Sequence, residues 1–302
     1  MVEVLVKAGC FVSIILLGYV LKRVGFFKEE DFTVLSKIVL KITLPAAIIS
    51  SFAGKEITVG LLAIALIPIG AGLLYMLIGY VMGRKGGKEQ QSFEVLNTAG
   101  YNIGNFTLPF VQSFLGPVGV VATSLFDTGN AVICLGGAYS VASMIKGSDK
   151  FSIVRILRTL TKSVAFDCYI IVVTMSLLHI PMPTPVISLA EIIGNANAFL
   201  AMFMLGVGFK LSGDKKQMGI IARILAFRYG VAIVLAVLCF LYLPLPLEMR
   251  QAITLLLFSP IGSAAPAFTA DMKGDVGLAS ALNSISILCS IVLLVITLLL
   301  IL

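Results

Sequence analysis

The sequence predicts an all-α polytopic membrane protein, with ten transmembrane helices in two inverted five-helix repeats and with crossed, broken helices 4 and 9. Three observations predict it: the composition, the recurrence of apolar runs of membrane length, and the confinement of positive charge to alternate loops. Of 302 residues, 59% are hydrophobic and 12% are charged, and the mean hydropathy is +1.08. Soluble domains carry about a quarter charged residues, so this composition leaves no soluble domain of useful size.

Apolar runs of about 20 residues fill the chain, and each can cross a hydrocarbon core about 30 Å thick as a helix. The first run lacks a small-residue cleavage site and carries its positive cluster after the apolar stretch. It therefore predicts a retained helix and not a signal peptide. We expect helices near residues 6–24, 32–53, 59–83, 92–114, 118–145, 157–179, 186–211, 218–243, 249–271 and 275–302.

Basic residues gather in the connections that follow the odd-numbered helices. The other connections and the N-terminus hold only Lys7, Lys55 and Arg250. Cytoplasmic loops carry such an excess, so we expect a multi-pass protein of the cytoplasmic membrane with both termini outside the cytoplasm. The net charge of +7 then reflects insertion into the lipid bilayer, and no nucleic acid partner is expected. The gathered residues are Lys22, Arg23, Lys28, Arg84, Lys85, Lys88, Lys146, Lys150, Arg155, Arg158, Lys162, Lys210, Lys215, Lys216, Arg223 and Lys273.

Catalytic and metal-binding patterns are missing from the sequence. The five cysteines are far apart, each lies in an apolar run, and no CxxC pair is present. His179 is the single histidine, which excludes an HExxH zinc motif and argues against a catalytic triad. We therefore expect no catalytic residue, no metal and no resident cofactor. An intramembrane enzyme remains the least favoured class, because no nucleophile and base share a plausible pocket.

An internal repeat divides the chain into halves. The stretch "PFVQSFLGPVGVVATSL" begins at Pro109, and "PAFTADMKGDVGLASAL" begins at Pro266, 157 positions later. Five crossings per half force the second half to enter the membrane upside down, which gives an inverted repeat. We expect residues 1–145 to form the first repeat, 146–162 a cytoplasmic linker, and 157–302 the second repeat.

Two of the predicted spans are interrupted at matching places. The fourth contains "NTAGYNIGNFTLPF" (97–110), and the ninth contains "LLLFSPIGSAAPAFTA" (255–270). Proline and glycine breaks are tolerated at membrane depth only where protein or a wet cavity covers the freed backbone groups. Two such breaks in inverted halves predict the crossing point of a secondary transporter and its binding site. The alternative is a pair of kinked helices whose small residues serve close packing.

The residues of this predicted site are uncharged, and they suit the binding of an anionic substrate. Asparagine offers donors and an acceptor at no cost of burying a charge. The half-helices that begin near the two prolines point partial positive charge at the membrane midplane, which favours a carboxylate. The candidate substrate-binding residues are Asn102, Asn105, Thr107, Pro109, Ser259, Ser263 and Pro266.

Ionisable residues inside the spans are few, and each is costly at the bilayer centre unless it is paired or wetted. Asp127, with Asn130 a turn later, is the candidate for ion or proton coupling; it could equally hold the broken helix ends or be a structural acid. Lys41 could snorkel to the interface or line an anion path. Arg228 and Asp167 could pair or lie at interfaces, and the sequence leaves this open.

Four stretches together resemble the auxin efflux carrier family of membrane transporters, and the polar, glycine-rich run before Pro109 is the most specific of them. They are "GYVLKRVGFFKEEDFTVLSKIVLKITLPAAIISSF" (18–52), "NTAGYNIGNFTLPFVQSFLGPVG" (97–119), "FDTGN" (126–130) and "FMLGVGFKL" (203–211). The resemblance implies a scaffold of helices 1, 2, 6 and 7 and a transport domain of helices 3–5 and 8–10. It also implies that Asn102 contacts the substrate carboxylate. The short loop at 146–156 departs from the long loop of many plant members and looks bacterial or archaeal.

The sequence thus favours a secondary active transporter that moves a small organic anion by an elevator-type movement, with a homodimer through the scaffold helices as a further expectation. The alternative is a membrane sensor or scaffold that keeps the fold and binds without transport. Coupling stays open. Asp127 could carry a proton, carbonyls of the broken helices could hold sodium, or the membrane potential could act on the anion alone.

Overall fold

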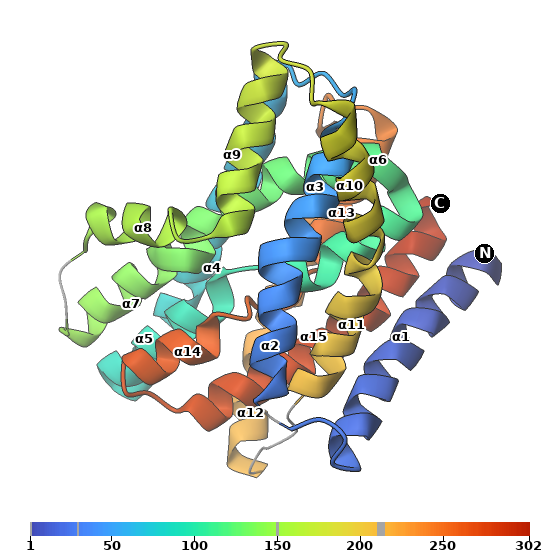
Figure 1. Ribbon diagram of the computed structural model, residues 1–302. Coiled ribbons are helices and arrows are strands. Elements are labelled where there is room, and N and C mark those ends of the chain that lie inside the picture. The colour runs from blue at the N-terminus through green and yellow to red at the C-terminus, as the bar shows by residue number, and fades with distance from the viewer. Residues whose placement is uncertain (1, 29, 149–150, 210–214) are drawn as a thin grey trace.

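The computed structural model describes residues 2–28, 30–148, 151–209 and 215–302. Lys150 and Lys210 of the predicted charge pattern lie outside these residues, as do two residues of the predicted linker. The described part is almost entirely helical, and its β-structure is a single isolated bridge between Tyr101 and Ile261. This agrees with the predicted all-α membrane protein (Figure 1).

The helical elements follow the predicted spans closely. In chain order they are α1 (Val2–Arg23), α2 (Asp31–Ile38), η1 (Val39–Thr43), α3 (Leu44–Phe52), η2 (Val59–Ala65), α4 (Leu66–Gly83), η3 (Arg84–Gly86), α5 (Gly87–Ala99), η4 (Ile103–Thr107), α6 (Leu108–Val132), η5 (Ile133–Gly137), α7 (Ala138–Lys146), α8 (Ile153–Leu160), α9 (Val164–Leu177), α10 (Thr184–Asn195), α11 (Asn197–Gly208), α12 (Lys215–Tyr242), α13 (Leu247–Leu257), α14 (Ala265–Asp271) and α15 (Val276–Ile301).

Seven helical stretches of the described residues are long and apolar enough to cross a membrane, or eight if the bent pair α8 and α9 forms one span. Two of the seven, Val59–Ala99 and Ile103–Lys146, are 41 and 44 residues long, about twice what one crossing needs. The second is bent at Gly116, whose φ of +61° interrupts α6. The number of membrane spans counted by helix length is therefore lower than the predicted ten, because the longest helical stretches contain bends and are counted once each.

The expected ninth helix consists of two short pieces. Helix α13 has 11 residues and α14 has 7, and residues 258–264 separate them. At about 1.5 Å per residue, neither piece alone crosses the hydrocarbon core. Pro260 lies in this break, and Pro266 lies in the first turn of the helix that follows it.

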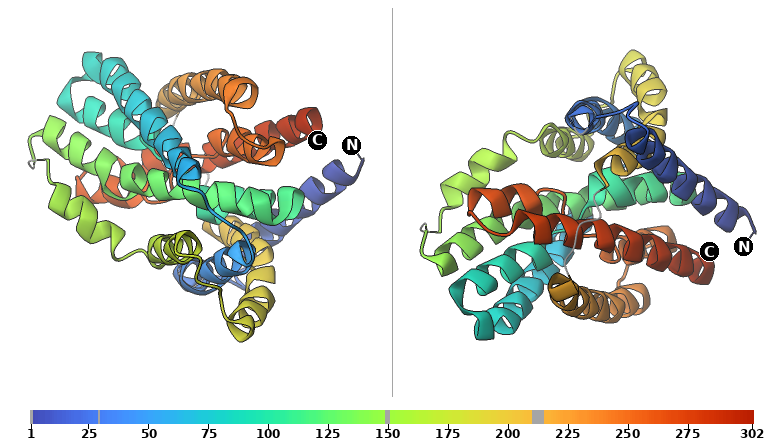
Figure 2. Two further views of the ribbon diagram at one scale, coloured as in Figure 1. Left: turned by 90° about the horizontal axis from the view of Figure 1, so that it is seen from above. Right: turned by 90° about the horizontal axis from the view of Figure 1, so that it is seen from below.

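The helices pack in two groups that meet along α6. In one group α1 packs on α11, and α3 packs on α10 and α9; in the other, α4 packs on α5, and α12 packs on α13. Figure 2 shows α1–α3 and α9–α11 on one side of α6, with α4, α5 and α12–α15 on the other. The α1–α11 contact is close: a Cβ at Gly206 would lie 2.0 Å from the main-chain oxygen of Ile15.

The connection between the two sequence halves contains a helix of its own. Ser152 caps α8 by accepting a hydrogen bond from the backbone N–H of Arg155. Helix α8 then meets α9 at 81°. Its residues Ile156 and Leu160 are buried, so α8 is anchored to the bundle by one apolar face. The sixth predicted span, 157–179, is thus reduced to α9, Val164–Leu177.

Candidate functional site

The two interrupted helices meet at their breaks, defined here as the first break (residues 100–102) and the second break (residues 258–264). Tyr101 and Ile261 form an antiparallel bridge. The backbone N–H of Asn102 donates to the oxygen of Pro260 over 2.9 Å, and that of Gly262 donates to the oxygen of Gly100 over 3.2 Å. Each break therefore satisfies backbone groups that the other leaves free, as burial at membrane depth requires.

Glycine permits a close approach of π-helix η5 to both breaks. A Cβ at Gly262 would lie 2.5 Å from Sγ of Cys134, and a Cβ at Gly100 would lie 2.9 Å from the same atom. Real Cβ atoms do not tolerate such distances without a shift of their neighbours. The two glycines thus allow Cys134 to pack against the paired backbone segments of the two breaks.

Candidate binding residues from the two breaks contact one another directly. Asn105 Nδ2 donates to Ser263 Oγ over 3.3 Å, and the hydroxyls of Thr107 and Ser259 share a hydrogen bond of 2.5 Å. Pro109 lies in the first turn of α6, and Pro266 lies in the first turn of α14. The structure brings the candidates from both halves of the sequence to one place. Their role in binding stays a prediction.

The half-helices that leave the two breaks differ in length. After the first break, π-helix η4 continues into α6 and runs on to the bend at Gly116. After the second break, α14 has only seven residues. The partial positive charge expected at a helix start is thus offered at the first break by η4, which begins at Ile103 directly after Asn102.

Asn130 holds the first break in place. Its side chain accepts a hydrogen bond from the N–H of Tyr101 (3.0 Å) and donates one to the oxygen of the same residue (2.9 Å). Asn130 Nδ2 also donates to Asp127 Oδ1 over 2.8 Å, and the hydroxyl of Tyr169 donates to Asp127 Oδ2 over 2.9 Å. Asp127 therefore reaches the break through Asn130 and reaches α9 of the other helix group through Tyr169.

Two cavities flank the crossing. The α15 cavity, of about 300 Å³, is lined by residues that include Lys22, Pro266 and Asn283. The α9 cavity, of about 380 Å³, is lined by residues that include Lys41, Asp127, Asn130, Lys162 and Tyr169. Phe32, Asn102, Asn105 and Ser263 line both. Volumes of this size suit a small-molecule ligand.

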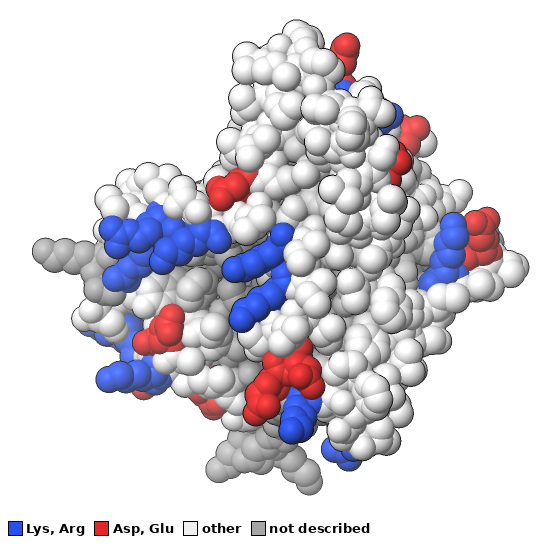
Figure 3. Space-filling model, in the orientation of Figure 1, with Lys and Arg blue, Asp and Glu red and all other residues white. Residues whose placement is uncertain are grey.

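The cavity walls combine positive charge with amide atoms that no described residue satisfies. Lys22, Lys41 and Lys162 are the cationic lining residues, and Asp127 is the acidic one. Figure 3 shows Lys and Arg side chains gathered around a hollow on one face of the molecule. Asn102 Nδ2 and Asn105 Oδ1 are buried and have no hydrogen-bond partner in the described part of the chain. Buried amide atoms ordinarily have partners, so these two are available to a ligand.

Comparison with known proteins supports a transport family. Residues 9–151 match the model of a family described as membrane transport protein. Over these residues, just under half of the chain, the sequence is similar to that family. This confirms the predicted resemblance for a stretch that contains the first break, Asp127 and Asn130. The second break and the quoted stretch at 203–211 lie outside the match.

A curated relative points the same way. The chain is 29% identical over 125 residues to a protein named "Uncharacterized transporter" from Methanothermobacter thermautotrophicus. The alignment covers 40% of this chain and 41% of the relative, so the chain is compared with about two fifths of that protein's length. The relative's name gives no substrate.

Several residues that complete the site were not predicted from the sequence. Asn283 Nδ2 donates to the oxygen of Ile261 over 2.8 Å, and the N–H of Ile261 donates to Ser286 Oγ over 3.1 Å. These contacts hold the second break as Asn130 holds the first. A lone asparagine in an apolar span that follows a break is the signal that could have identified Asn283. Arg228 was noted in the sequence with Asp167 as one possible partner, and its contacts are described below.

Proposed function

We propose that this chain is a secondary active transporter that carries a small organic anion, a carboxylate, across the cytoplasmic membrane. One observation supports this most directly. Two helix breaks from the two halves of the sequence pair with each other, and beside them Asn102 and Asn105, each with a buried amide atom that no described residue satisfies, line cavities that lysines also line. In this proposal Asn102, Asn105 and Ser263 contact the carboxylate, while Thr107, Ser259 and the two prolines shape the break.

The proposed movement is an elevator in which one helix group slides against the other. Helices α1–α3 and α9–α11 form the scaffold, and α4–α7 with α12–α15 form the transport domain. The grouping of helix contacts supports this division. The two halves are then inverted repeats with five crossings each, joined by the linker that contains α8, and both termini lie outside the cytoplasm. The scaffold also offers the surface for a homodimer.

Asp127 is the proposed coupling residue, acting with Asn130. It bridges the two helix groups, because it accepts hydrogen bonds from Asn130 on α6 and from Tyr169 on α9. A proton gained or lost at this carboxyl group changes the contact between the groups as well as the charge beside the substrate. Coupling through Asp127 thus links occupancy of the site to movement of the transport domain.

The experiment is flux into proteoliposomes that contain the purified chain, with a panel of radiolabelled monocarboxylates and dicarboxylates. We expect saturable uptake of at least one acid that accelerates when unlabelled substrate is present on the opposite side. Loss of this flux in Asn102→Ala and a changed pH dependence in Asp127→Asn are the expected results. Unchanged transport in both variants would exclude this site. Binding without exchange in any condition would instead identify a sensor.

A further inference from the structure

Arg228, on α12, is a fully buried arginine with an exposed fraction of 1%. Its guanidinium donates to main-chain oxygens of both breaks. Nη1 donates to Thr98, and Nη2 lies 3.0 Å from the oxygen of Gly100, 3.1 Å from that of Ser259 and 3.4 Å from that of Pro260. One side chain thus binds the carboxyl ends of the two half-helices α5 and α13.

The surroundings of this guanidinium are aromatic and not acidic. Its Cζ lies 5.0 Å from the ring centroid of Tyr75 and 4.9 Å from that of Tyr101, within the range of cation–π attraction. No carboxylate of the described residues is within ion-pair distance of Arg228. Its charge is instead balanced by the ring faces and by the partial negative charge at two helix carboxyl ends.

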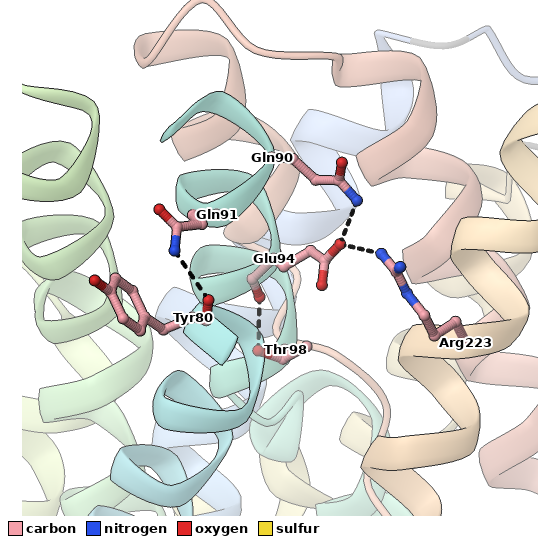
Figure 4. Close-up of polar contacts among 6 residues, drawn as sticks. All are labelled: Tyr80, Gln90, Gln91, Glu94, Thr98 and Arg223. Atoms are coloured by element: carbon pink, nitrogen blue, oxygen red, sulfur yellow. Dashed lines mark hydrogen bonds and ion pairs between the residues drawn. The ribbon is translucent and has the colours of Figure 1, made fainter. Parts of the chain in front are cut away.

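A second arginine on the same helix shows the ordinary arrangement. Arg223 forms an ion pair with Glu94 of α5, whose Oε1 also accepts a hydrogen bond of 2.8 Å from Gln90 (Figure 4). Glu94 is fully buried, and a buried charge normally needs such a partner. Helix α12 therefore supplies two arginines to α5, one bound to an acid and one bound to carbonyl oxygens.

We infer that Arg228 is the resident cation of the crossing point, and that it makes an inorganic cation unnecessary there. A sodium ion would be held at such a place by backbone carbonyl oxygens of the broken helices. Here four of these oxygens already receive hydrogen bonds from one guanidinium that the chain itself provides. The negative ends of α5 and α13 are thereby neutralised permanently, and the positive end of η4, which begins directly after the first break, remains available to the anion.

Arg228 is a positioning residue in this inference. It does not belong to the residues that line the α15 and α9 cavities in the described chain, so it acts by fixing the two breaks. The consequence for transport, which rests on the proposed function, is that flux does not depend on sodium. The consequence for stability is independent of any transport activity.

The test measures thermal unfolding of the purified chain in detergent, with sodium, choline or methylguanidinium as the only added cation. The wild-type midpoint is expected to be equal in sodium and in choline. Arg228→Ala is expected to unfold at lower temperature and to regain stability with millimolar methylguanidinium, which can occupy the space left among the carbonyl oxygens. A wild-type midpoint raised by sodium, or an Arg228→Ala protein as stable as wild type, would overturn the inference.

Arg250→Ala is the matched control. Arg250 also donates to a main-chain oxygen, that of Phe240 at 2.9 Å, and lies over the Phe240 ring, but it lies near the start of α13, at the end away from the second break. Methylguanidinium should not restore this variant, and equal recovery of both variants would contradict a specific cation site. If Arg228→Ala does not fold, Arg228→Lys replaces it, since one ammonium cannot reach all four oxygens and leaves a measurable loss.

Flux completes the test once a substrate is known. Replacement of sodium by choline at constant membrane potential should leave wild-type flux unchanged, whereas displaced breaks in Arg228→Lys should reduce it by about 100-fold, as misplacement by about 1 Å can do. Sodium-dependent wild-type flux would refute the inference and leave transport itself established. Absence of any flux would refute the proposed function and leave the stability result standing.

Discussion

The two helix breaks perform the same structural task with different chemistry. Each break is held by an asparagine of the span that follows it, Asn130 for the first and Asn283 for the second. Both also share the Arg228 guanidinium. The residues next to the breaks differ: the first is followed by amides with free polar atoms, whereas the second carries small hydroxyl groups.

The difference indicates a division of labour between the halves. Asn102 and Asn105 can recognise a ligand by donor and acceptor together. Ser263 is exposed to the cavities and offers one hydroxyl and little bulk. In the proposed function the first break therefore recognises the anion, and the second leaves room for it. The following predictions test this asymmetry.

The largest effect on stability is expected from the asparagines that hold the breaks. Asn130→Ala removes the partners of both the N–H and the oxygen of Tyr101, and each unsatisfied buried group costs about 1–3 kcal/mol. Asn283→Ala removes the partner of the Ile261 oxygen and a longer contact of 3.5 Å to the oxygen of Gly262, while Ser286 still accepts from the Ile261 N–H. Unfolding free energies in detergent should show about twice the loss for Asn130→Ala. Equal losses would mean that the two breaks are held equally.

A smaller effect, also different between the breaks, is expected at the glycines packed on Cys134. Gly262→Ala should cost about 1–3 kcal/mol by overpacking, and a second change, Cys134→Ala, should remove most of that cost. The reason is that Sγ is the only atom of Cys134 near the added Cβ. At Gly100 the Cβ and Cα of Cys134 would also be 3.0 Å and 3.2 Å away. Cys134→Ala should therefore rescue Gly100→Ala only in part, which a double-mutant cycle of thermal unfolding can measure.

Much of the fold follows from the sequence because hydrophobic length and loop charge are local properties. The third span was predicted at 59–83, and η2 with α4 covers Val59–Gly83. The breaks were predicted because proline and glycine interrupt a helix wherever they stand in it. The sequence pattern missed α8, since an eight-residue amphipathic helix between charged residues resembles a loop.

The partners of the site residues follow from the sequence much less well. Arg228 is visible as a lone charge in an apolar span, but its partners are main-chain oxygens, which every residue carries and no motif marks. Its suggested pairing with Asp167 does not occur: Arg228 is buried against carbonyl oxygens, and Asp167 is exposed. The contact between Asn105 and Ser263 joins residues 158 positions apart, and only the folded arrangement of the repeats brings them together.

The predicted effect on ligand affinity separates the breaks again. Asn102→Ala removes an amide whose Nδ2 has no partner among the described residues, and a hydrogen bond to a charged group is worth about 1.5–3 kcal/mol, or about 10- to 100-fold in Kd. Ser263→Ala removes a hydroxyl that Asn105 already uses, so the loss should be several-fold smaller. Calorimetric titration with the acid identified by flux gives both values. A larger loss for Ser263→Ala would assign recognition to the second break.

The smallest effect on stability is expected for Asp127→Asn. The asparagine oxygen can still accept from Asn130 Nδ2, and its amide can donate to the oxygen of Tyr169, so the first hydrogen bond keeps its direction and the second reverses. The unfolding free energy should change by less than about 1 kcal/mol, within the range of a net hydrogen bond. Transport should nevertheless lose its response to an imposed pH gradient, because the variant has no proton to exchange at this position. A loss of several kcal/mol with an intact pH response would show instead that Asp127 is a structural acid that holds Asn130 against the first break, and coupling would then have to lie elsewhere in the transport domain.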